Sequence, residues 1–471
     1  MNKPTVSIII PTYNAEAFLA ETIQSVLDQI YTDFELIIVD DASTDQTSDI
    51  VRGYEDPRIK FIQQEENQGA DIARHAGLQA SSGEIVTFWD HDDLFHSENV
   101  QTHATYLERH PDVGVTYNGR FELNYSSNTI RDLWRPPRHI SLADLVLWFP
   151  LAPSDLFFRR KWAFQMNLLE ASRGSEISDF GDLYLSGCKF AFVGRALNYR
   201  RYHSGRIIGD IYEACHSEIQ CQEKILADPR CPSKVKKLRN VAHATLYLYW
   251  GYMAFAQNET APGQEFIRKA VQLHPTSIDG KPCELLTSFL INCIDDENLN
   301  HESQLQRVLK QLPPELDWLS EQYHWAAMQG YLLKGTRAVI WNRPDDGRRH
   351  FEQAARLGAQ VEGYYLNTLV DKLLDYEAEF GIEARRDVYQ ALVPHLINIG
   401  GKVSVRRLKG ALLINHAFKS FHAGDHAIVP TRILRAIASN PKYLTNRGVL
   451  SILFRSIVGS LKQSRPASRK L

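Results

Sequence analysis

The chain has 471 residues, of which 44% are hydrophobic and 23% are charged, and its formal net charge is −3. This composition is that of a globular protein with about two to four domains, and it excludes a general polyanion-binding surface for nucleic acid. The six cysteines contain no Cys-x-x-Cys pair, so we expect free thiols in a reducing compartment rather than zinc ligands.

The N-terminus carries no signal-peptide pattern, and no apolar run approaches the roughly 20 residues of a membrane span. We therefore expect a soluble, cytoplasmic protein without a transmembrane segment. The tail 462–471 is basic and contains serine and proline. Weak attraction to an anionic membrane surface, and with it a peripheral location, is a further expectation.

Four apolar segments near the N-terminus alternate with amphipathic ones. Strands are predicted at 6–10, 34–39, 58–62 and 84–89, and helices at 15–29, 47–54 and 70–80. This alternation predicts an α/β domain with a mostly parallel sheet flanked by helices. Ligands of such sheets bind beyond the carboxyl ends of the strands, where this sequence places three polar clusters: Pro11–Tyr13, Asp40–Asp41 and Asp90–Asp93.

The last cluster, Asp90-His91-Asp92-Asp93, directly follows a buried apolar strand. Side chains alternate along an extended segment, so Asp90 and Asp92 can point the same way. Their oxygen ligands and a nearby histidine suit Mg²⁺ or Mn²⁺, whereas the alternative is a polar loop with a helix N-cap. Neither G-x-G-x-x-G nor G-x-x-x-x-G-K-[ST] is present after the first strand, which argues against a dinucleotide site and a P-loop.

The next part of the chain is less regular. We expect a helix at 97–109, strands at 113–117, 154–159 and 197–203, and an Arg-, Pro- and Trp-rich loop at 131–138. A further helix at 176–185 places Glu176, Asp179 and Asp182 on one face.

From about residue 217 the pattern is all helical, and the segments 249–275, 328–358 and 418–441 resemble one another. Small residues in one helix, an aromatic and alanine-rich second helix and a closing proline resemble tetratricopeptide-type hairpins, with an irregular bundle as the alternative. Helical hairpins present concave surfaces, so we expect this region to bind acceptor chains or a protein partner, or to form a homodimer.

The motifs of the first 110 residues resemble, in order and separation, those of the family-2 inverting glycosyltransferases of the GT-A fold. They are Val6–Asn14, Val39–Thr47, Asn67–Gly69 with Ala73-Arg74, and Asp90–Asp93. The resemblance fades but continues to about Ser204. It implies a metal-dependent hexosyltransferase of polysaccharide biosynthesis that moves a sugar from a nucleotide donor, UDP-linked by this resemblance, to a saccharide or lipid-linked acceptor.

The resemblance also implies roles for single residues. Tyr13 matches the aromatic that stacks on the base, Thr12 lies in the same loop, and Asp41 matches the carboxylate that accepts a hydrogen bond from the base. Arg74 is similar to the basic residue that faces the nucleotide. The implied ligands of a Mn²⁺ or Mg²⁺ ion are Asp92 and His203, and His203 is implied to lie near the diphosphate. Asp90 and Asp93 lie beside Asp92 and are implied to contact the nucleotide.

The sequence departs from the family where the catalytic base is expected. The usual Glu-Asp pair falls at Asp179-Phe180, so the second acid is replaced by phenylalanine. We assign the base to Asp179, with Asp182 and Glu176 as reserves. The alternative is that these acids only form the solvated first turn of a helix, where acids are favourable.

This departure motivates a competing function, a non-catalytic nucleotide-sugar-binding or scaffold protein whose helical region recruits partners. A nucleotidyltransferase is a third reading, but Pro11–Ala15 lacks the Gly-rich, basic loop of that class. The expected organisation is a GT-A domain at 1–215, a helical linker at 216–240 and an all-helical, tetratricopeptide-like region at 241–471.

Overall fold

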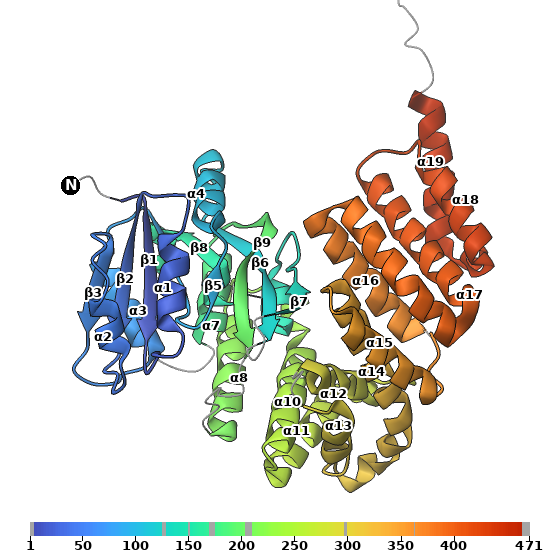
Figure 1. Ribbon diagram of the computed structural model, residues 1–471, viewed down its shortest axis with the longest axis horizontal. Coiled ribbons are helices and arrows are strands. Elements are labelled where there is room, and N and C mark those ends of the chain that lie inside the picture. Colours follow the sequence, from blue (N-terminus) through green and yellow to red (C-terminus); the bar gives the residue numbers. More distant parts are fainter. Residues whose placement is uncertain are drawn as a thin grey trace, which may run out of the picture. The chain divides into compact units, whose positions relative to one another are not determined.

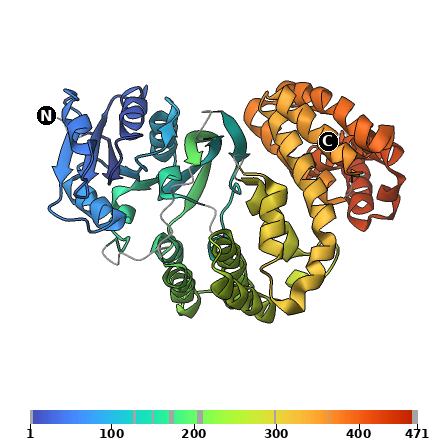
Figure 2. The same cartoon turned by 60° about the horizontal axis from the view of Figure 1, so that its bottom comes forward.

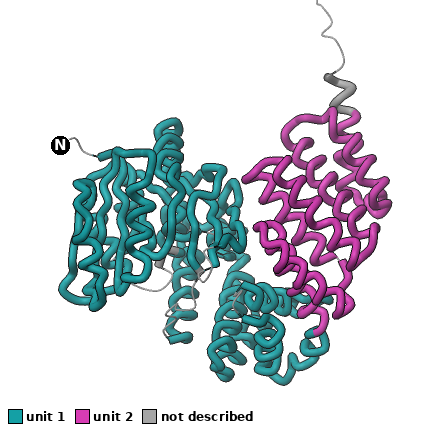
Figure 3. Tube along the Cα trace, viewed as in Figure 1, with its two compact units in different colours: residues 1–323 teal, residues 324–471 magenta. Residues whose placement is uncertain are grey.

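The computed structural model describes residues 4–124, 129–148, 151–168, 175–202, 210–295, 299–361 and 363–463. The chain divides into two compact units, Met1–Tyr323 and His324–Leu471 (Figure 3). The boundaries expected near residues 215 and 240 both lie within the first unit, and they stay a prediction.

The first unit is built on a nine-stranded sheet in the order β3-β2-β1-β4-β8-β6-β9-β5, with β7 paired to β6 (Figure 1). Its strands are β1 Val6–Thr12, β2 Phe34–Asp40, β3 Ile59–Gln63, β4 Ile85–Phe88, β5 Leu94–Phe95, β6 Val115–Asn124, β7 Ile130–Trp134, β8 Leu156–Arg159 and β9 Phe190–Tyr202. β1 to β4 are mutually parallel, so their carboxyl ends lie at one edge, as predicted.

The sheet is mixed: β6 and β9 pair parallel with each other and run in the same direction as β1 to β4, because β8 is antiparallel to both β4 and β6. β8 runs antiparallel to both β4 and β6, and β7 and β5 pair antiparallel with β6 and β9. Short connections such as that between β6 and β7 impose antiparallel pairing, because a parallel pair needs a long crossover. The loop predicted at 131–138 is also wrong in part, since Arg131 and Leu133 alternate as buried residues of β7.

Helices cover both faces of the sheet, because successive side chains of the buried strands point to opposite sides. Ile8 and Ile10 of β1 pack on the layer of α1 Leu19–Leu27, α2 Thr47–Arg52 and α4 Asn99–Arg109. Ile9 packs on the other layer, which consists of α3 Ala70–Ala80, α5 Leu142–Leu147, α7 Ser175–Leu185 and α8 Ile211–Ala227.

Helices make up the rest of the chain. The first unit also contains α6 Arg160–Ala163, α9 Ser233–Lys236, α10 Arg239–Ala256, α11 Thr260–Leu273, α12 Glu284–Asp295 and α13 His301–Leu309, and the 3₁₀ helices η1 Pro153–Asp155, η2 Pro275–Ile278 and η3 Pro314–Gln322. The second unit contains α14 Tyr323–Ile340, α15 Pro344–Arg356, α16 Gly363–Phe380, α17 Ile382–His422, α18 Val429–Ser439, η4 Pro441–Thr445 and α19 Arg447–Gln463. Figure 2 shows α16, α17 and α18 side by side.

The three similar segments predicted from the sequence are each a pair of helices joined by a short turn: α10 with α11, α14 with α15, and the end of α17 with α18. Glycines let the first two pairs approach closely. A methyl group at Gly251 would lie 2.6 Å from Ile267, and one at Gly347 would lie 2.6 Å from Val339. None of the described helices is long and apolar enough to cross a bilayer.

Candidate functional site

The polar residues predicted at the ends of β1 and β2 lie next to each other. Thr12 of β1 is opposite Asp40 of β2, and the Thr12 carbonyl accepts a hydrogen bond of 2.8 Å from the Asp41 amide. Thr12 is buried and its hydroxyl donates to the Val39 carbonyl, 3.3 Å away. Tyr13, the next residue, is 40% exposed, so its ring remains accessible at this edge of the sheet.

Asn14 joins the loops that follow β1 and β2, an interaction that the sequence analysis did not assign. Its side-chain oxygen accepts hydrogen bonds from the Thr44 amide, at 2.9 Å, and the Thr44 hydroxyl, at 3.3 Å. Asn14 has a φ of 48°, a left-handed conformation that asparagine tolerates better than most residues. Two further hydrogen bonds join the same loops: the Asp45 carboxylate accepts one from the Glu16 amide, and the Glu16 carboxylate accepts one from the Gln46 amide.

Asp41 connects this pair of loops to the start of α3. Its carboxylate accepts hydrogen bonds from the backbone amides of Gln68, at 2.9 Å, and Gly69, at 2.7 Å. Gly69 precedes α3 with a φ of 95°, which glycine adopts without strain. Asp41 is buried, and each of its oxygens retains a second lone pair that can accept a further hydrogen bond.

Arg74 extends from α3 to the acidic cluster after β4. Its Nη2 donates to Asp90 Oδ1 at 3.0 Å and its Nη1 donates to Asp71 Oδ1 at 2.8 Å. The Asp90 amide donates to the Ser154 hydroxyl at 3.0 Å, which fixes the backbone at the end of the strand. Burial acts to raise the pKa of Asp90, but Arg74 and Arg200 outweigh it and hold that pKa below its usual value.

Asp93 is the most buried acid of the cluster, with 4% of its surface exposed. Burial and the charges of Asp92 and Asp90 raise the pKa of Asp93 well above its usual value. The three side chains supply only oxygen donors, and those of Asp90 and Asp92 are partly exposed at the strand end. Such a donor set fits a hard divalent cation.

Within the described ranges, no group of three or more acidic, histidine or cysteine side chains surrounds one point. Mg²⁺ at phosphate sites takes only one or two carboxylates and fills its other positions with water and phosphate oxygens. His203, the predicted histidine ligand, lies outside the described residues.

Two arginines of β9 face the acidic cluster, and sequence reasoning missed both. Arg201 donates from its amide to Asp93 Oδ1 at 3.3 Å and from Nη1 to the Asp92 carbonyl at 3.1 Å, and it forms an ion pair with Glu21. The charges of Glu122, Asp93, Asp90 and Asp155 raise the pKa of Arg200 against the opposing effect of burial. The sequence signal for them is their position three and two residues before His203.

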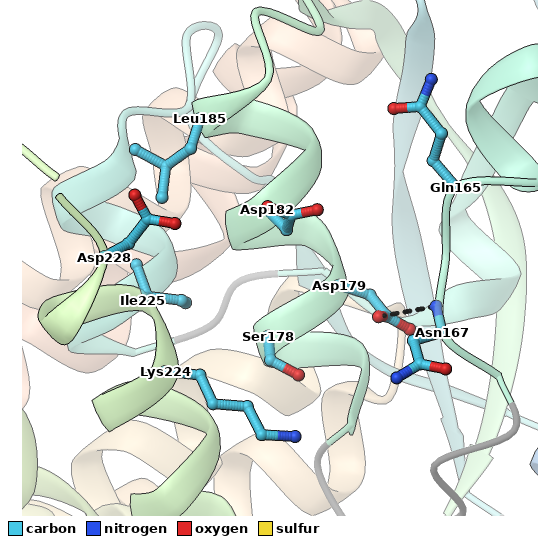
Figure 4. Close-up of a pocket in the computed structure, with 9 residues that line it drawn as sticks. All are labelled: Gln165, Asn167, Ser178, Asp179, Asp182, Leu185, Lys224, Ile225 and Asp228. Carbon is cyan, nitrogen blue, oxygen red and sulfur yellow. Dashed lines mark hydrogen bonds between the residues drawn. The ribbon is translucent and has the colours of Figure 1, made fainter. Parts of the chain in front are cut away.

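Asp179 of α7 lies on the wall of two cavities. The larger has a volume of about 240 Å³ and is lined by residues of α7, α8 and the segment after α6: Gln165, Asn167, Ser178, Asp179, Asp182, Leu185, Lys224, Ile225 and Asp228 (Figure 4). The smaller has a volume of about 10 Å³, and Asp179, Asp71 and Arg74 share its lining with six apolar residues: Phe88, Pro153, Phe158, Met166, Leu168 and Phe180. One Asp179 oxygen accepts a hydrogen bond of 3.0 Å from the Asn167 amide. Asp179 and Arg74, which also contacts Asp90, therefore both line this small cavity.

The neighbours of Asp179 explain the departure from the Glu-Asp pair. Phe180 is fully buried and packs against Phe158 of β8, with ring centroids 6.0 Å apart. Position 180 therefore belongs to the core beneath the sheet. Asp182 forms an ion pair of 2.5 Å with Arg230 and is about half exposed. The side chain of Glu176, the other reserve, is outside the described residues.

The N-terminal third of the chain matches a known family. Residues 7–162 match the family model Glycosyl transferase family 2. This range contains β1 to β4, the three polar clusters and Arg74. This part of the chain is therefore similar to the glycosyltransferases of that family.

Curated relatives match between about a fifth and a third of the chain. A putative teichuronic acid biosynthesis glycosyltransferase of Bacillus subtilis, TuaG, is 43% identical over 107 residues, 22% of this chain and 42% of its own length. The Escherichia coli enzyme WfgD, a UDP-Glc:α-D-GlcNAc-diphosphoundecaprenol β-1,3-glucosyltransferase, is 33% identical over 146 residues, 31% of this chain and 56% of its own length. Staphylococcus aureus TarS, a poly(ribitol-phosphate) β-N-acetylglucosaminyltransferase, is 38% identical over 108 residues, 22% of this chain and 19% of its own length.

Two solved structures show a more distant likeness. TarS 1-349 of S. aureus in complex with UDP-GlcNAc has a TM-score of 0.40 and 19% identity, over 76% of this chain and 93% of that one. The mannosyltransferase PcManGT of Pyrobaculum calidifontis, in complex with GDP-Man and Mn²⁺, has a TM-score of 0.43 and 16% identity, over 69% and 88%. Scores of this size do not relate individual site residues of this chain to theirs.

Proposed function

We propose that this protein is a metal-dependent inverting glycosyltransferase that moves a sugar from a nucleotide donor to the hydroxyl of a saccharide or lipid-linked acceptor. One observation carries the proposal: Arg74 contacts Asp90 of the acidic cluster and lines the same cavity as Asp179. This shared lining supports the proposal that the acidic cluster, within the segment that matches the family model, serves the donor and that Asp179 serves the acceptor.

The donor is proposed to be a UDP-sugar. Tyr13 offers an exposed ring for the base, and Asp41, whose backbone amide is bonded to Thr12, has carboxylate lone pairs that can accept a further hydrogen bond. WfgD, which uses UDP-Glc by its name, is 33% identical to this chain over 146 residues. Thr12 is buried against β2, so its proposed role is to position this loop beside the nucleoside.

The diphosphate is proposed to lie at Asp90-His91-Asp92-Asp93. A Mn²⁺ or Mg²⁺ ion held by Asp92, with His203 as a further proposed ligand, supplies positive charge to offset that of the leaving group. Asp90 and Asp93 hold the cluster in place through Arg74 and the Arg201 amide.

Asp179 is the proposed general base. The acceptor oxygen attacks the anomeric carbon from the face opposite the diphosphate, its proton passes to the Asp179 carboxylate, and the bond to the leaving phosphate oxygen breaks. The Asn167 amide orients the Asp179 side chain. The all-helical part, with its repeated helix pairs, is proposed to be tetratricopeptide-like and to contact the acceptor or a partner.

The proposal is tested by release of UDP from a panel of UDP-sugars, in the presence of Mn²⁺ and saccharide or diphospholipid-linked acceptors. Replacement Asp92→Asn should lower turnover roughly 100-fold or more, because it removes charge compensation at the leaving group. The exposed Asp49→Asn is the matched control and should retain full activity. Binding of UDP without turnover of any donor and acceptor pair would instead favour the non-catalytic scaffold.

A further inference from the structure

The two compact units differ sharply in charge. The first, residues 1–323, contains 45 acidic and 30 basic residues, whereas residues 324–471 contain 11 acidic and 23 basic ones. The contrast is strongest at the C-terminal end, where no acidic residue occurs from His426 onward and nine lysines and arginines do. This end of the chain therefore carries a one-sided positive charge.

Helix α19 combines this charge with an apolar stripe that the fold does not use. Leu450, Phe454 and Ile457 are spaced by four and three residues, so they share one face of the helix. They are 39%, 70% and 44% exposed. The opposite side of α19 carries Val449 and Ile452, which are buried in a cluster with α17 and α18.

Basic residues flank this stripe. Arg447 and Arg455 of α19 are exposed, the first lying one turn before Leu450 and the second following Phe454. α18 and η4, which both contact α19, add further pairs of exposed apolar and basic side chains: Leu434 with Arg435, and Leu444 with Lys442. In Figure 1, α19 stands beside α18 at the end of the second unit.

We infer that this face of α19, with Leu450, Phe454 and Ile457 at its centre and Arg447 and Arg455 beside them, docks on an anionic phospholipid bilayer. A helix that exposes aromatic and aliphatic side chains beside arginines lies in the bilayer interface: the apolar side chains enter the headgroup boundary and the cations contact lipid phosphates. Docking requires no membrane span. It is independent of the proposed transfer, because no site residue lies in the second unit.

A second copy of the chain is the less suitable occupant. A twofold symmetric contact places the same patch on both sides, so Arg447 and Arg455 would face their own copies without an acid nearby. Like charges across an interface oppose association. The charge pattern is instead complementary to an anionic surface.

The test is co-sedimentation of the full chain with extruded vesicles of phosphatidylcholine alone, or with about 30% phosphatidylglycerol, the composition that supplies the anionic surface potential. We expect binding to the anionic vesicles, weakened by salt, and little binding to the neutral ones. The variant Leu450→Ser/Phe454→Ser/Ile457→Ser should bind at least roughly tenfold more weakly, because the apolar side chains no longer enter the bilayer. The matched control Ile382→Ser/Val403→Ser removes side chains that are 55% and 53% exposed elsewhere in this unit, and should bind as wild type does.

A second variant keeps the test decisive if the serine variant is unstable. Arg447→Gln/Arg455→Gln leaves the apolar stripe intact and should reduce binding to anionic vesicles roughly thirtyfold, at about 1 kcal/mol for each of the two charges removed. Equal binding of neutral and anionic vesicles, wild-type binding by either variant, or no vesicle binding at all would overturn the inference. Light scattering that shows a dimer of wild type, lost in the serine variant, together with no vesicle binding, would assign the stripe to a second copy.

Discussion

Arg74 Nη2 donates a hydrogen bond to Asp90 Oδ1 over 3.0 Å, and through it helix α3 is tied to the end of β4. The other terminal nitrogen of the guanidinium is bound to Asp71 at 2.8 Å, so the side chain is held at both ends of its fork. Arg74 therefore joins Asp71 to Asp90, and it lines the same small cavity as Asp179.

Replacement of Arg74 should therefore impair use of the donor more than it impairs folding. We expect Arg74→Ala to lower kcat/KM for the nucleotide sugar roughly 10- to 100-fold, the range for a lost hydrogen bond to a charged group. Arg74→Lys should recover only part of the loss, since a single ammonium lacks the fork that reaches both Asp71 and Asp90. Arg52→Ala, at an exposed ion pair, is the control; wild-type kcat/KM in Arg74→Ala would refute a role at the donor.

The contact of Asn14 with Thr44 should hold the loops after β1 and β2 in the geometry that binds the nucleoside. Asn14→Asp retains the oxygen acceptor and Asn14→Gly retains only the freedom to adopt a φ of 48°. Asn14→Ala retains neither and adds roughly 1 kcal/mol of backbone strain. We expect the melting temperature and the affinity for UDP to fall in the order Asp, Gly, Ala. Equal values for all three variants would show that the loops do not depend on this contact.

Buried His103 should make the first unit sensitive to acid. His103 Nδ1 and Nε2 lie 2.8 Å from the Thr116 hydroxyl and 2.9 Å from the Asn118 side-chain oxygen, and its ring stacks on Phe157. Burial lowers the pKa of His103 from 6.5 to about 3. Above pH 6.5 both folded and unfolded chains carry the neutral ring, whereas at lower pH the unfolded chain binds a proton that the folded one excludes.

The contribution of His103 to stability is therefore complete above pH 6.5 and is lost progressively toward pH 3. Its loss amounts to about 2 kcal/mol at pH 5, at 1.36 kcal/mol per pH unit. Urea unfolding of His103→Gln at pH 7, 6 and 5 should show a correspondingly shallower pH dependence than wild type. The exposed His139→Gln is the control and should keep the wild-type slope. An unchanged slope in His103→Gln would mean that this histidine is protonated in the folded chain.

The parts of the site that lie within one local pattern could be predicted from the sequence. β1, β2 and β4 are continuous apolar runs followed by polar residues, and helix α3 has the bounds predicted for it. Contacts between distant segments could not be predicted. Arg201 reaches the acidic cluster only because β9 passes beside it, more than 100 residues later in the chain.

Other differences between the sequence-based predictions and the structure have separate causes. The family pattern alone predicts an acid at the position of Phe180. In the structure Phe180 is buried against Phe158, so this position has a packing role. The arginine, proline and tryptophan residues around β7 predict a loop, because they obscure the alternation of buried and partly exposed side chains that marks the strand. The antiparallel pairing of β5, β7 and β8 follows from strand connections that hydrophobic patterns do not specify.

Asp179 carries the central claim, that this chain performs transfer and does not only bind a nucleotide sugar. The measurement is a comparison of Asp179→Asn with Asp182→Asn, recording both UDP-sugar affinity in Mn²⁺ and the rate of transfer to an acceptor. We expect Asp179→Asn to bind the donor as wild type does and to transfer the sugar at least roughly 100-fold more slowly, because it lacks the general base. Asp182→Asn removes an ion pair with Arg230 in which both side chains are about half exposed to solvent. This variant should transfer the sugar at the wild-type rate. Wild-type transfer by Asp179→Asn, with donor affinity unchanged, would contradict the account.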